Sequence, residues 1–322
     1  MPSYDVGELI RRLRKQKNMN QEELAYPIID RATLSKIETG KVTPHRKTLE
    51  YLFDRLGFDS NEYISHFLTT GDVEMQLVVD EVSNLLKNVS RAEKGIVKNA
   101  KCERVEFLIK QLEENQEFAT HPLNRQLILD VKARHAFNQK EDEKAAALCI
   151  EALEIEIPNY SNDNIAFYHL SRRCNNILNL LAMILSEVKN YEEAITILYG
   201  LKSNVDQTFK EIGIHAKHVS AVIRNLAMIL LLADNPEDAW EICEEGIIIC
   251  CKANEYLHYN AICWFQAKAL MALGKTEEFI ELSRKVYYSF DLFRVENHKD
   301  FVRDTVLAET GVDIAGLPPK CE

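Results

Sequence analysis

The chain has 322 residues, of which 46% are hydrophobic, with only 11 glycines and 8 prolines, which indicates about two domains built from long helices rather than many short strands. The net charge of −11 excludes a protein that is basic over its whole surface, as a general nucleic-acid coat would be. The charge is uneven, since residues 1–68 carry 11 Lys+Arg against 10 Asp+Glu and the acidic excess lies in the rest of the chain.

Neither a metal centre nor a membrane anchor is expected. The eight cysteines include no C-x-x-C pair, and Cys149, Cys174, Cys243 and Cys263 lie in apolar runs typical of small core residues. The N-terminus lacks the apolar region of a signal peptide, and no segment reaches the roughly 18 apolar residues that span a bilayer. We therefore expect a cytoplasmic protein with reduced thiols.

The first expected helix covers residues 6–17. Leu9, Ile10 and Leu13 recur at helical spacing and are expected to face the core. The basic residues of this helix are expected to face outward and to lie near DNA phosphates: Arg11, Arg12, Arg14, Lys15 and Lys17.

The stretch over residues 20–41 predicts two short helices around a tight turn. Asn20 is a good N-cap, and Glu23 three residues later completes a capping box. Asp30 is the N-cap of the second helix, and Gly40 is expected to end it.

The second helix of this pair has one polar and one apolar side. Arg31, Thr33 and Lys36 share the polar side, opposite Leu34 and Ile37. Two capped helices with polar side chains on the exposed side of the second indicate a helix-turn-helix DNA reader.

Two more helices are expected in this domain. One begins at Thr43-Pro44, with proline at its first helical position, and ends at Gly57. A fifth helix is expected over residues 59–68.

A polar stretch, Thr69–Asp72, is the best candidate for a domain boundary. We therefore expect a DNA-binding domain over residues 1–70 and a second domain over residues 71–322. The second domain is expected to open with a helix over residues 73–88.

The runs NQEELA, LSKIETGK and TLEYLF resemble the Xre/Cro-type helix-turn-helix domains of phage repressors over residues 5–68. The resemblance implies that Gln21 contacts a phosphate and that Arg31, Ala32 and Lys36 face base edges. The corner between the two helices is one residue shorter than in the repressor pattern. The candidate DNA-contacting residues are Gln21, Arg31, Ala32, Thr33, Lys36, Lys41 and Arg46.

The rest of the chain repeats a pair of helices. Ala133, Ala182, Ala227 and Ala267 align, and twelve residues after each comes another residue expected at a helix crossing: Ala145, Ala194, Ala239 and Phe279. Small residues at such crossings let two helices approach, which is the tetratricopeptide pattern. The intervals of 49, 45 and 40 residues exceed the usual period of about 34, so longer helices or turns are expected.

The expected fold is all-α. An Xre/Cro-type five-helix DNA-binding domain precedes a tetratricopeptide-like right-handed helical solenoid of about five helix pairs. A degenerate pair is expected over residues 90–116 and a terminal capping helix over residues 299–310.

In such a solenoid the first helix of each pair lines the concave face. Positions −6, −3, +1 and +4 from each reference alanine are expected to face that groove. Asparagine amides there can pair with the backbone of a peptide of any sequence, and Arg134 or Arg224 can hold a carboxylate by two parallel hydrogen bonds. The candidate peptide-contacting residues at these positions are Asp130, Arg134, Asn176, Asn179, Arg224 and Trp264, and their neighbours Asn225 and Asn260 are further candidates.

An Xre-type domain joined to an acidic tetratricopeptide domain of this length resembles the RRNPP group of peptide-pheromone regulators of Gram-positive bacteria, relatives of Rgg, PlcR, NprR and PrgX. The resemblance implies quorum sensing: an imported oligopeptide binds the concave face, through Asn176, Asn179 and Arg224 here, and changes how a homodimer holds a pseudo-palindromic promoter site in double-stranded DNA.

Two other functions remain open. The repeats of such a regulator could instead bind or sequester a folded protein, or the chain could be a phage-type repressor whose second domain only oligomerises. An enzyme is not expected, because no P-loop, G-x-G-x-x-G or G-x-S-x-G motif occurs. His215-x-x-His218 has no further ligand at metal-binding spacing, so we expect no metal and no cofactor.

Overall fold

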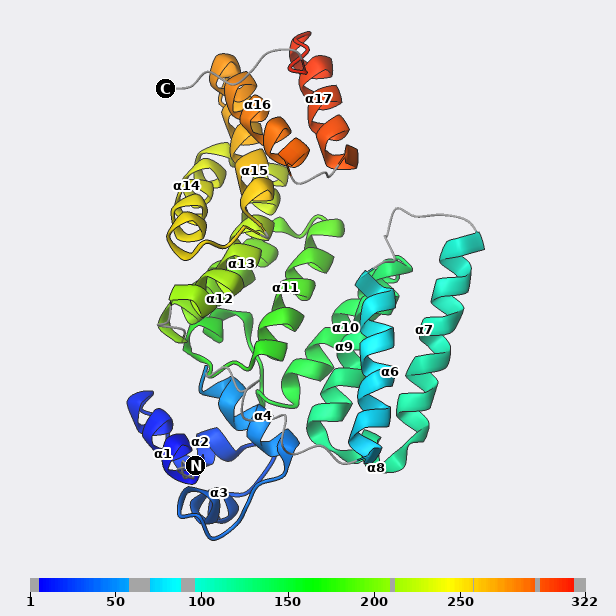
Figure 1. The fold of residues 1–322 in the computed structure, drawn as a ribbon, viewed down its shortest axis with the longest axis vertical. Coiled ribbons are helices and arrows are strands. Elements are labelled where there is room, and N and C mark those ends of the chain that lie inside the picture. The colour runs from blue at the N-terminus through cyan, green and yellow to red at the C-terminus, as the bar shows by residue number, and fades with distance from the viewer. Residues whose placement is uncertain are drawn as a thin grey trace. The chain divides into compact units, whose positions relative to one another are not determined.

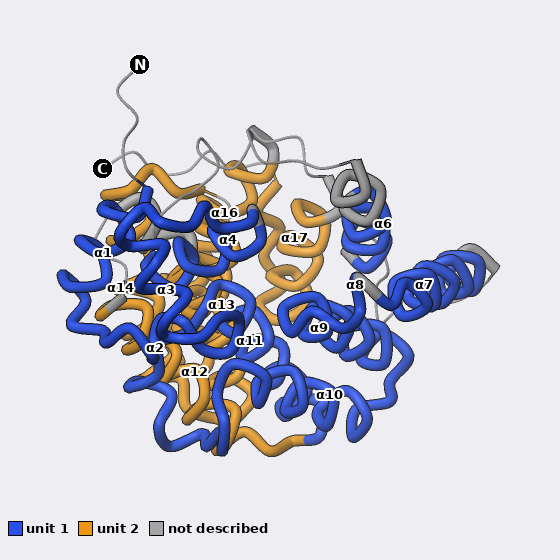
Figure 2. Tube along the Cα trace, turned by 90° about the horizontal axis from the view of Figure 1, so that it is seen from below, with its two compact units in different colours: residues 1–188 blue, residues 189–322 orange. Residues whose placement is uncertain are grey.

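The computed structural model describes residues 6–57, 70–87, 96–208, 212–256, 258–292 and 296–315. Every regular element in these ranges is a helix, and no strand occurs among them (Figure 1). The predicted all-α fold class is confirmed. By compactness the chain divides into two units, residues 1–188 and residues 189–322 (Figure 2).

The N-terminal part of the first unit packs short helices around one apolar core. These helices are α1 (Val6–Gln16), α2 (Gln21–Ala25), α3 (Arg31–Glu38) and α4 (Arg46–Arg55). Each helix contributes almost fully buried side chains, which include Ile10, Leu24, Leu34, Leu52 and Phe53. Burying a side chain of this size stabilises a fold by about 1.5–3 kcal/mol. The fifth helix predicted over residues 59–68 lies outside the described residues.

The predicted caps of α2 and α3 are confirmed. Asn20 Oδ1 accepts a hydrogen bond from Glu23 N–H at 2.8 Å, and Glu23 Oε2 accepts one from Asn20 N–H at 2.6 Å, so the capping box is reciprocal. Asp30 Oδ1 accepts from Thr33 N–H at 2.6 Å. Gly40 follows α3 with a φ of 71°, the left-handed conformation that ends many helices.

The close contact between α1 and α3 depends on Gly7. A Cβ atom on Gly7 would lie 2.0 Å from the carbonyl oxygen of Ile37. No side chain fits in that space, so only glycine allows the two helices to approach this closely.

The starts of two helices and one predicted helix pair differ from the sequence prediction. α4 begins at Arg46 because His45 before it still has extended backbone angles. The next described helix, α6 (Thr70–Lys87), starts within the polar stretch predicted as a boundary. Of the helix pair predicted over residues 90–116, the structure describes one long helix, α7 (Ile96–Glu114), which contains neither glycine nor proline to interrupt it.

The first unit continues with the first repeats. α6 packs on α7 through Val82 and Leu86, which meet Val105 and Leu108. After α7 come α8 (Gln116–Thr120), α9 (Pro122–Asn138), α10 (Asp142–Glu154), the 3-10 helix η1 (Asn162–Phe167) and α11 (Arg172–Glu187). The long connection between α10 and α11 buries Ile165, and it accounts for the first interval of 49 residues.

The second unit is a stack of longer helices. They are α12 (Tyr191–Thr208), α13 (Ile212–Leu232), α14 (Pro236–Ala253), α15 (Tyr259–Ala272), α16 (Thr276–Leu292) and α17 (Glu296–Thr310). Each packs on the next, and α13 also packs on α15, which is the neighbour pattern of a helical-repeat stack. The predicted terminal helix is confirmed as α17.

The predicted repeat register is confirmed by burial. The eight residues expected at helix crossings are all 0% exposed: Ala133, Ala145, Ala182, Ala194, Ala227, Ala239, Ala267 and Phe279. The residue seven positions after each reference alanine has a left-handed backbone, and these residues are Lys140, Lys189, Asp234 and Gly274. The same turn geometry therefore recurs in all four repeats, although only one of them uses glycine.

Candidate nucleic-acid interface and repeat surfaces

α3 has the two sides predicted for a recognition helix. Leu34 and Ile37 are buried, whereas Arg31, Ala32 and Lys36 are exposed. The hydrogen bonds that Thr33 donates lower the pKa of the N-cap Asp30, so its carboxylate stays ionised at the positive end of the helix dipole.

A buried ion pair fixes α3 against α1. Arg14 Nε lies 2.6 Å from Glu38 Oε1, and Arg14 Nη2 lies 3.0 Å from Glu38 Oε2, so the pair is bidentate. Arg14 Nη1 also donates to the Met19 carbonyl at 2.9 Å. Burial would raise the pKa of Glu38, but hydrogen bonds from Arg14 and Gln21 outweigh burial and hold that pKa below its usual value. The pair therefore holds the end of α3 against α1.

This pair corrects one prediction for α1. Arg14 was expected to face outward with the other basic residues, but it is 9% exposed and lies inside the domain. The physical reason is that Glu38 would otherwise be a buried carboxylate without a cation. Gln21, predicted to contact a phosphate, donates from Nε2 to Glu38 Oε2 at 2.9 Å and joins α2 to the same pair.

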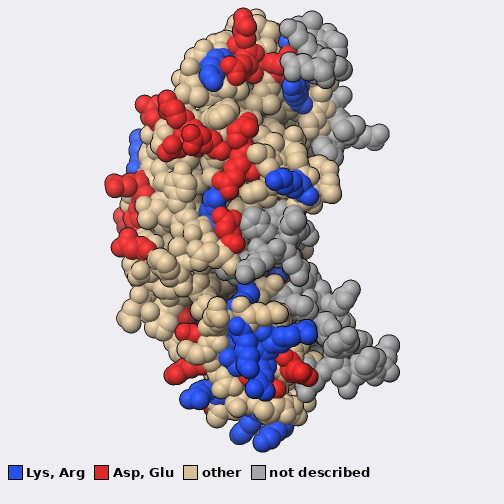
Figure 3. Space-filling model, turned by 90° about the vertical axis from the view of Figure 1, so that its left-hand side faces the viewer, with Lys and Arg blue, Asp and Glu red and all other residues tan. Residues whose placement is uncertain are grey.

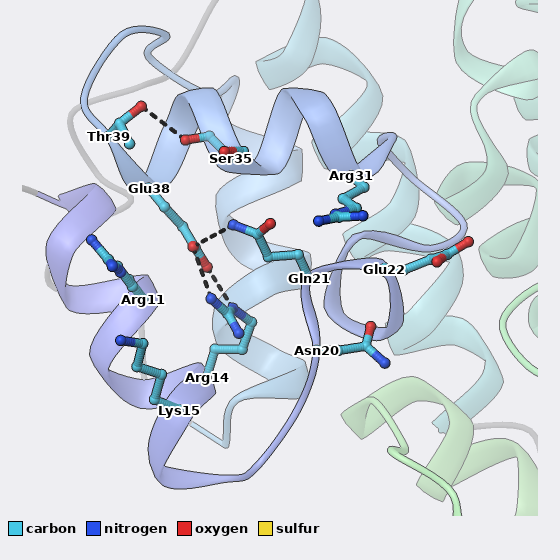
Figure 4. Close-up of a pocket in the computed structure, with 10 residues that line it drawn as sticks. All are labelled: Arg11, Arg14, Lys15, Asn20, Gln21, Glu22, Arg31, Ser35, Glu38 and Thr39. Atoms are coloured by element: carbon cyan, nitrogen blue, oxygen red, sulfur yellow. Dashed lines mark hydrogen bonds and ion pairs between the residues drawn. The ribbon is translucent and has the colours of Figure 1, made fainter.

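A pocket of about 600 Å³ opens beside the pair (Figure 4). Arg14, Gln21 and Glu38 form one wall, joined by the hydrogen bonds that the figure marks. Exposed cations from two helices stand around it, namely Arg11 and Lys15 of α1 and Arg31 of α3. The lining also includes two acidic residues, of which Glu38 is paired with Arg14 and Glu22 is exposed. Arg11, Lys15 and Arg31 therefore leave the pocket with an excess of positive charge, which suits an anion such as a phosphate group.

The remaining residues predicted to contact DNA are Thr33, Lys41 and Arg46. Thr33 is half-buried at the start of α3, and Lys41 is exposed just beyond its end. Arg46 is the first residue of α4, and its side chain lies outside what the structure describes. Figure 3 shows Lys and Arg gathered over the end of the first unit that holds α1–α4, whereas Asp and Glu predominate over the repeats on that face. Contact with DNA stays a prediction for each of these residues.

The end of α4 joins the helix-turn-helix part to the first repeats within unit 1. Arg55 donates to Tyr51 Oη at 2.7 Å and to the His169 carbonyl at 3.2 Å. Asp54 Oδ2 accepts from the backbone N–H of Arg172 at 2.6 Å, at the start of α11. Burial raises the pKa of Asp54 to about 6. No sequence signal indicated the contacts with His169 and Arg172, because in each the partners are more than 110 residues apart.

On the repeat surface of unit 1, two of the residues predicted to contact a peptide bind each other. Arg134 Nε lies 2.9 Å from Asp130 Oδ1, so these two candidates form an ion pair with each other. Asn176 is exposed and Asn179 is half-buried, on the same side of α11. The guanidinium of Arg134 therefore already has an acidic partner, whereas Asn176 is open to solvent.

In unit 2, three side chains meet where α13 faces the start of α15. Arg224 donates from Nε at 3.0 Å and from Nη2 at 2.9 Å to Asn225 Oδ1, and its Nη1 lies 3.3 Å from His258 Nδ1. Burial lowers the pKa of Arg224. Burial, followed by the charge of Arg224, lowers the pKa of His258 to about 4. The sequence prediction included Arg224 and Asn225 but missed His258, for which no signal was available.

The other two candidates of unit 2 are engaged in the fold. Asn260 Oδ1 accepts from Ser289 Oγ at 2.7 Å. Trp264 is 9% exposed and packs between Phe279 and Phe301 at centroid distances of 6.4 and 5.8 Å. Peptide contact stays a prediction for both, but most of the indole surface is already covered.

The described residues contain neither a metal-binding cluster nor a membrane-spanning helix. No group of three or more His, Cys, Asp or Glu side chains there is arranged to hold a metal ion. No helix in that part of the chain has the length and apolarity needed to cross a bilayer. The four cysteines predicted as core residues, Cys149, Cys174, Cys243 and Cys263, are buried and free.

The N-terminal part of the chain matches a known domain family. The model of a family described as a helix-turn-helix domain matches residues 5–63. This range holds α1–α4 and the Arg14–Glu38 pair, so the predicted DNA-binding motif is confirmed as a member of a recognised domain family. No curated protein matches the sequence of this chain.

Solved structures match nearly the whole chain. PlcR of Bacillus thuringiensis, in complex with the peptide PapR7 and DNA, is similar with a TM-score of 0.55 and 17% identity, over 93% of this chain and 99% of that chain. The SHP pheromone receptor Rgg2 of Streptococcus dysgalactiae has a TM-score of 0.50 and 12% identity, over 95% and 100%. The TPR-like repeats of a kinesin light chain from Podosopora anserina have a TM-score of 0.50 and 16% identity, over 69% and 96%.

At these identities the likeness concerns the fold. It confirms the expected architecture of a helix-turn-helix domain followed by tetratricopeptide-like repeats, and it extends over almost the full length of both PlcR and Rgg2. The chain therefore carries a helix-turn-helix domain and shares its overall fold with PlcR and with the pheromone receptor Rgg2.

Proposed function

We propose that this protein is a sequence-specific DNA-binding transcription regulator, and that a short signalling peptide bound to its repeats controls its grip on DNA. The observation that carries the proposal is a capped α3 with exposed Arg31 and Lys36, fixed by a buried ion pair, in a chain whose fold matches a regulator solved with both peptide and DNA. As part of the proposal, the protein acts in the cytoplasm as a homodimer and is not an enzyme.

The DNA-binding half of the proposal follows from the shape of the basic pocket. Arg11 and Lys15 on α1 would hold phosphates, while α3 enters the major groove beside them. Arg31 would read a base edge, with guanine as its usual partner. In a homodimer, two copies of α3 would reach successive major grooves about 34 Å apart, which calls for a pseudo-palindromic site.

The peptide half rests on the first helices of the repeat pairs. Asn176 is exposed, and Asn179 and Arg224 are half-buried, on the first helices of their pairs, where the repeat register predicts peptide contact. Asn225 is buried beside Arg224 and accepts its hydrogen bonds. An amide offers both a donor and an acceptor, so such a surface can bind the backbone of an extended peptide. A peptide controls DNA binding only if it binds one conformation of the protein better than another.

Arg31→Ala in the full chain tests the DNA-binding half. Preferred sites are selected from random duplex DNA, and the affinity of the variant is then measured on the selected site and on a scrambled duplex. We expect a loss of about 1–3 kcal/mol on the selected site, roughly fivefold to 150-fold, and little change on the scrambled duplex.

Arg125→Ala is the matched control, since Arg125 is an exposed arginine whose ion pair with Glu151 lies on the repeat surface. It is expected to leave both affinities unchanged. Equal losses on selected and scrambled DNA for Arg31→Ala would remove Arg31 from base recognition. Selection of no preferred sequence by the wild-type chain would overturn sequence-specific binding itself.

A further inference from the structure

Arg224 is an arginine without an acidic partner among the described residues. Other cations of the repeats are paired: Arg134 with Asp130, Lys268 with Glu309, and Lys202 with Asp206 and Glu245. The acceptors of Arg224 are instead the amide oxygen of Asn225 and a ring nitrogen of His258. A half-buried guanidinium whose hydrogen-bond partners are neutral is short of one negative charge.

The hydrogen bonds define the state of the empty site. A guanidinium only donates, so His258 Nδ1 must accept, and its ring is neutral with the proton on Nε2. Asn225 occupies the Nε proton and one Nη2 proton of Arg224, and His258 occupies one Nη1 proton. One N–H on each terminal nitrogen is left over. Two such donors on one planar group match the two oxygens of a carboxylate.

The position of the site favours an anion further. Arg224 lies on the half-buried stripe of α13 that also contains Ala221, Met228 and Leu231, while the residues between them are mostly buried. His258 is the residue immediately before α15, where the helix dipole is positive. The charged groups that face His258 are Arg224 from α13 and Glu255 from the segment after α14.

We propose that Arg224 and His258 together bind a carboxylate of the peptide ligand, and that His258 takes up a proton when this carboxylate arrives. The proposal rests on the proposed peptide-binding function, and it selects Arg224 over Arg134 as the anchor because Arg134 already has Asp130. The carboxylate is either the C-terminus of the peptide or an Asp or Glu side chain.

Proton uptake follows from the contact between two potential cations. In the empty site, a proton on His258 Nδ1 would break its bond with Arg224 and place two positive charges in contact. A bound carboxylate removes that penalty and accepts a hydrogen bond from the protonated ring. The pKa of His258 therefore rises above about 4 on binding, and affinity increases as the pH falls through the range between the free and bound values.

The probes are three pools of synthetic random heptapeptides, passed over the immobilised full chain and identified by mass spectrometry. The first has a free C-terminus and no Asp or Glu, the second an amidated C-terminus with Asp and Glu allowed, and the third no carboxylate at all. We expect retention from the first or the second pool, which identifies the source of the carboxylate, and none from the third.

Variants then assign the carboxylate to the site. Arg224→Met should weaken the best retained peptide by at least about tenfold, whereas Arg125→Met, the matched control at an exposed arginine outside the predicted peptide contacts, should not. Ala221→Glu places a carboxylate one turn before Arg224 and should also block binding, while Ala221→Gln should not. His258→Gln should bind at pH 7 but lose the gain on acidification, which in wild type reaches at most about tenfold per pH unit.

The outcomes separate this proposal from the proposed function. Equal retention of all three pools would overturn the carboxylate receptor and leave peptide binding intact. Retention of no pool by the wild-type chain would count against peptide binding and against this proposal with it. The preference among pools needs only the wild-type protein, so a variant that fails to fold does not decide the result.

Discussion

Two arginines illustrate how differently the two parts of this chain are built. Arg14 in the helix-turn-helix part lies 2.6 Å from a buried carboxylate and also holds a backbone carbonyl. Arg224 in the repeats is held by Asn225 and His258, which are neutral, and has no acidic partner among the described residues. A guanidinium whose charge is already balanced positions the elements around it, whereas one whose charge is unbalanced is available to a ligand.

The difference fits the tasks proposed for the two parts. A DNA-reading helix must keep one angle, so the residues around α3 satisfy one another across α1 and α2. A receptor surface must exchange one partner for another, so it cannot complete its own hydrogen bonds. The comparison therefore predicts where substitutions change stability and where they change ligand binding.

The largest effect is expected from Glu38→Ala, which leaves Arg14 buried without its partner. Breaking a buried pair in this way costs about 3–5 kcal/mol. The two tryptophans, Trp240 and Trp264, lie in the second unit and do not report on this region. Hydrogen exchange measured by mass spectrometry on peptides from α1–α3 reports on it directly. We expect the protection of these peptides from exchange to fall steeply, while the protection of peptides from α13–α16 is unchanged.

Glu81→Ala is the control for this prediction, because Glu81 pairs with Arg104 on the surface, where both side chains are more than 40% exposed. Such a pair contributes at most about 1 kcal/mol. Adding Arg14→Met to Glu38→Ala should restore part of the protection, since it removes the buried charge. Equal effects of Glu38→Ala and Glu81→Ala would contradict the structural role given to the Arg14–Glu38 pair.

Asp54 is intermediate between the paired Arg14 and Arg224, which has no acidic partner among the described residues, because the charge of Asp54 is only partly balanced. Its carboxylate accepts a hydrogen bond from the backbone N–H at the start of α11 and lies 3.6 Å from one guanidinium nitrogen of Arg172. Its pKa is about 6 in the folded chain, above the usual 3.8. The folded state therefore binds more protons than the unfolded state between these values, so stability falls as the pH rises from about 4 to 6 and this contribution is constant above 6.

Asp54→Asn should remove this pH dependence, because an amide oxygen can still accept the Arg172 N–H without a charge to bury. We expect the variant to be more stable than wild type at pH 7 by about 1–2 kcal/mol, the full shift being reduced because the side chain is 24% exposed. Hydrogen exchange in α4 and α11 at pH 5 and 7 checks this. Asp304→Asn, on the surface of α17, should leave the exchange of α4 and α11 unchanged at both pH values.

How far the sequence predicted the structure depends on the range of each interaction. The caps at Asn20 and Asp30 are local, because acceptor and donor are three residues apart, and both were predicted correctly. The Arg14–Glu38 pair and the contact of Asp54 with Arg172 join residues 24 and 118 positions apart. Periodicity cannot indicate them, which is why Arg14 was assigned to the wrong side of α1.

In the repeats, the same reasoning explains why the stripe was predicted and its partners were not. The spacing of the reference alanines fixes which side of each helix is buried, so Ala227 at 0% exposure also locates Arg224. His258 precedes α15 by one residue and belongs to no repeated pattern. Its meeting with Arg224 depends on how α13 packs on α15, and that packing is known only from the structure.

The smallest effect is expected at Gln21, where the resemblance and the structure assign different partners. The resemblance implies a phosphate contact, whereas the structure shows Gln21 Nε2 donating to Glu38 Oε2 at 2.9 Å. If Gln21 serves the Arg14–Glu38 pair, Gln21→Leu should cost about 0.5–1.5 kcal/mol of local stability, seen as faster exchange in α2 and α3. DNA affinity should then fall less than about threefold.

Lys15→Ala separates the two roles of the pocket, because Lys15 is an exposed cation on the same pocket without a place in the ion pair. It should lower affinity for all sequences and reduce the slope of log affinity against log salt by about one, because one fewer counterion is released. Gln21 is neutral, so Gln21→Leu should leave that slope unchanged. A loss of DNA affinity near tenfold for Gln21→Leu, with unaltered hydrogen exchange, would instead make Gln21 a direct DNA contact and leave Arg14 as the sole essential partner of Glu38.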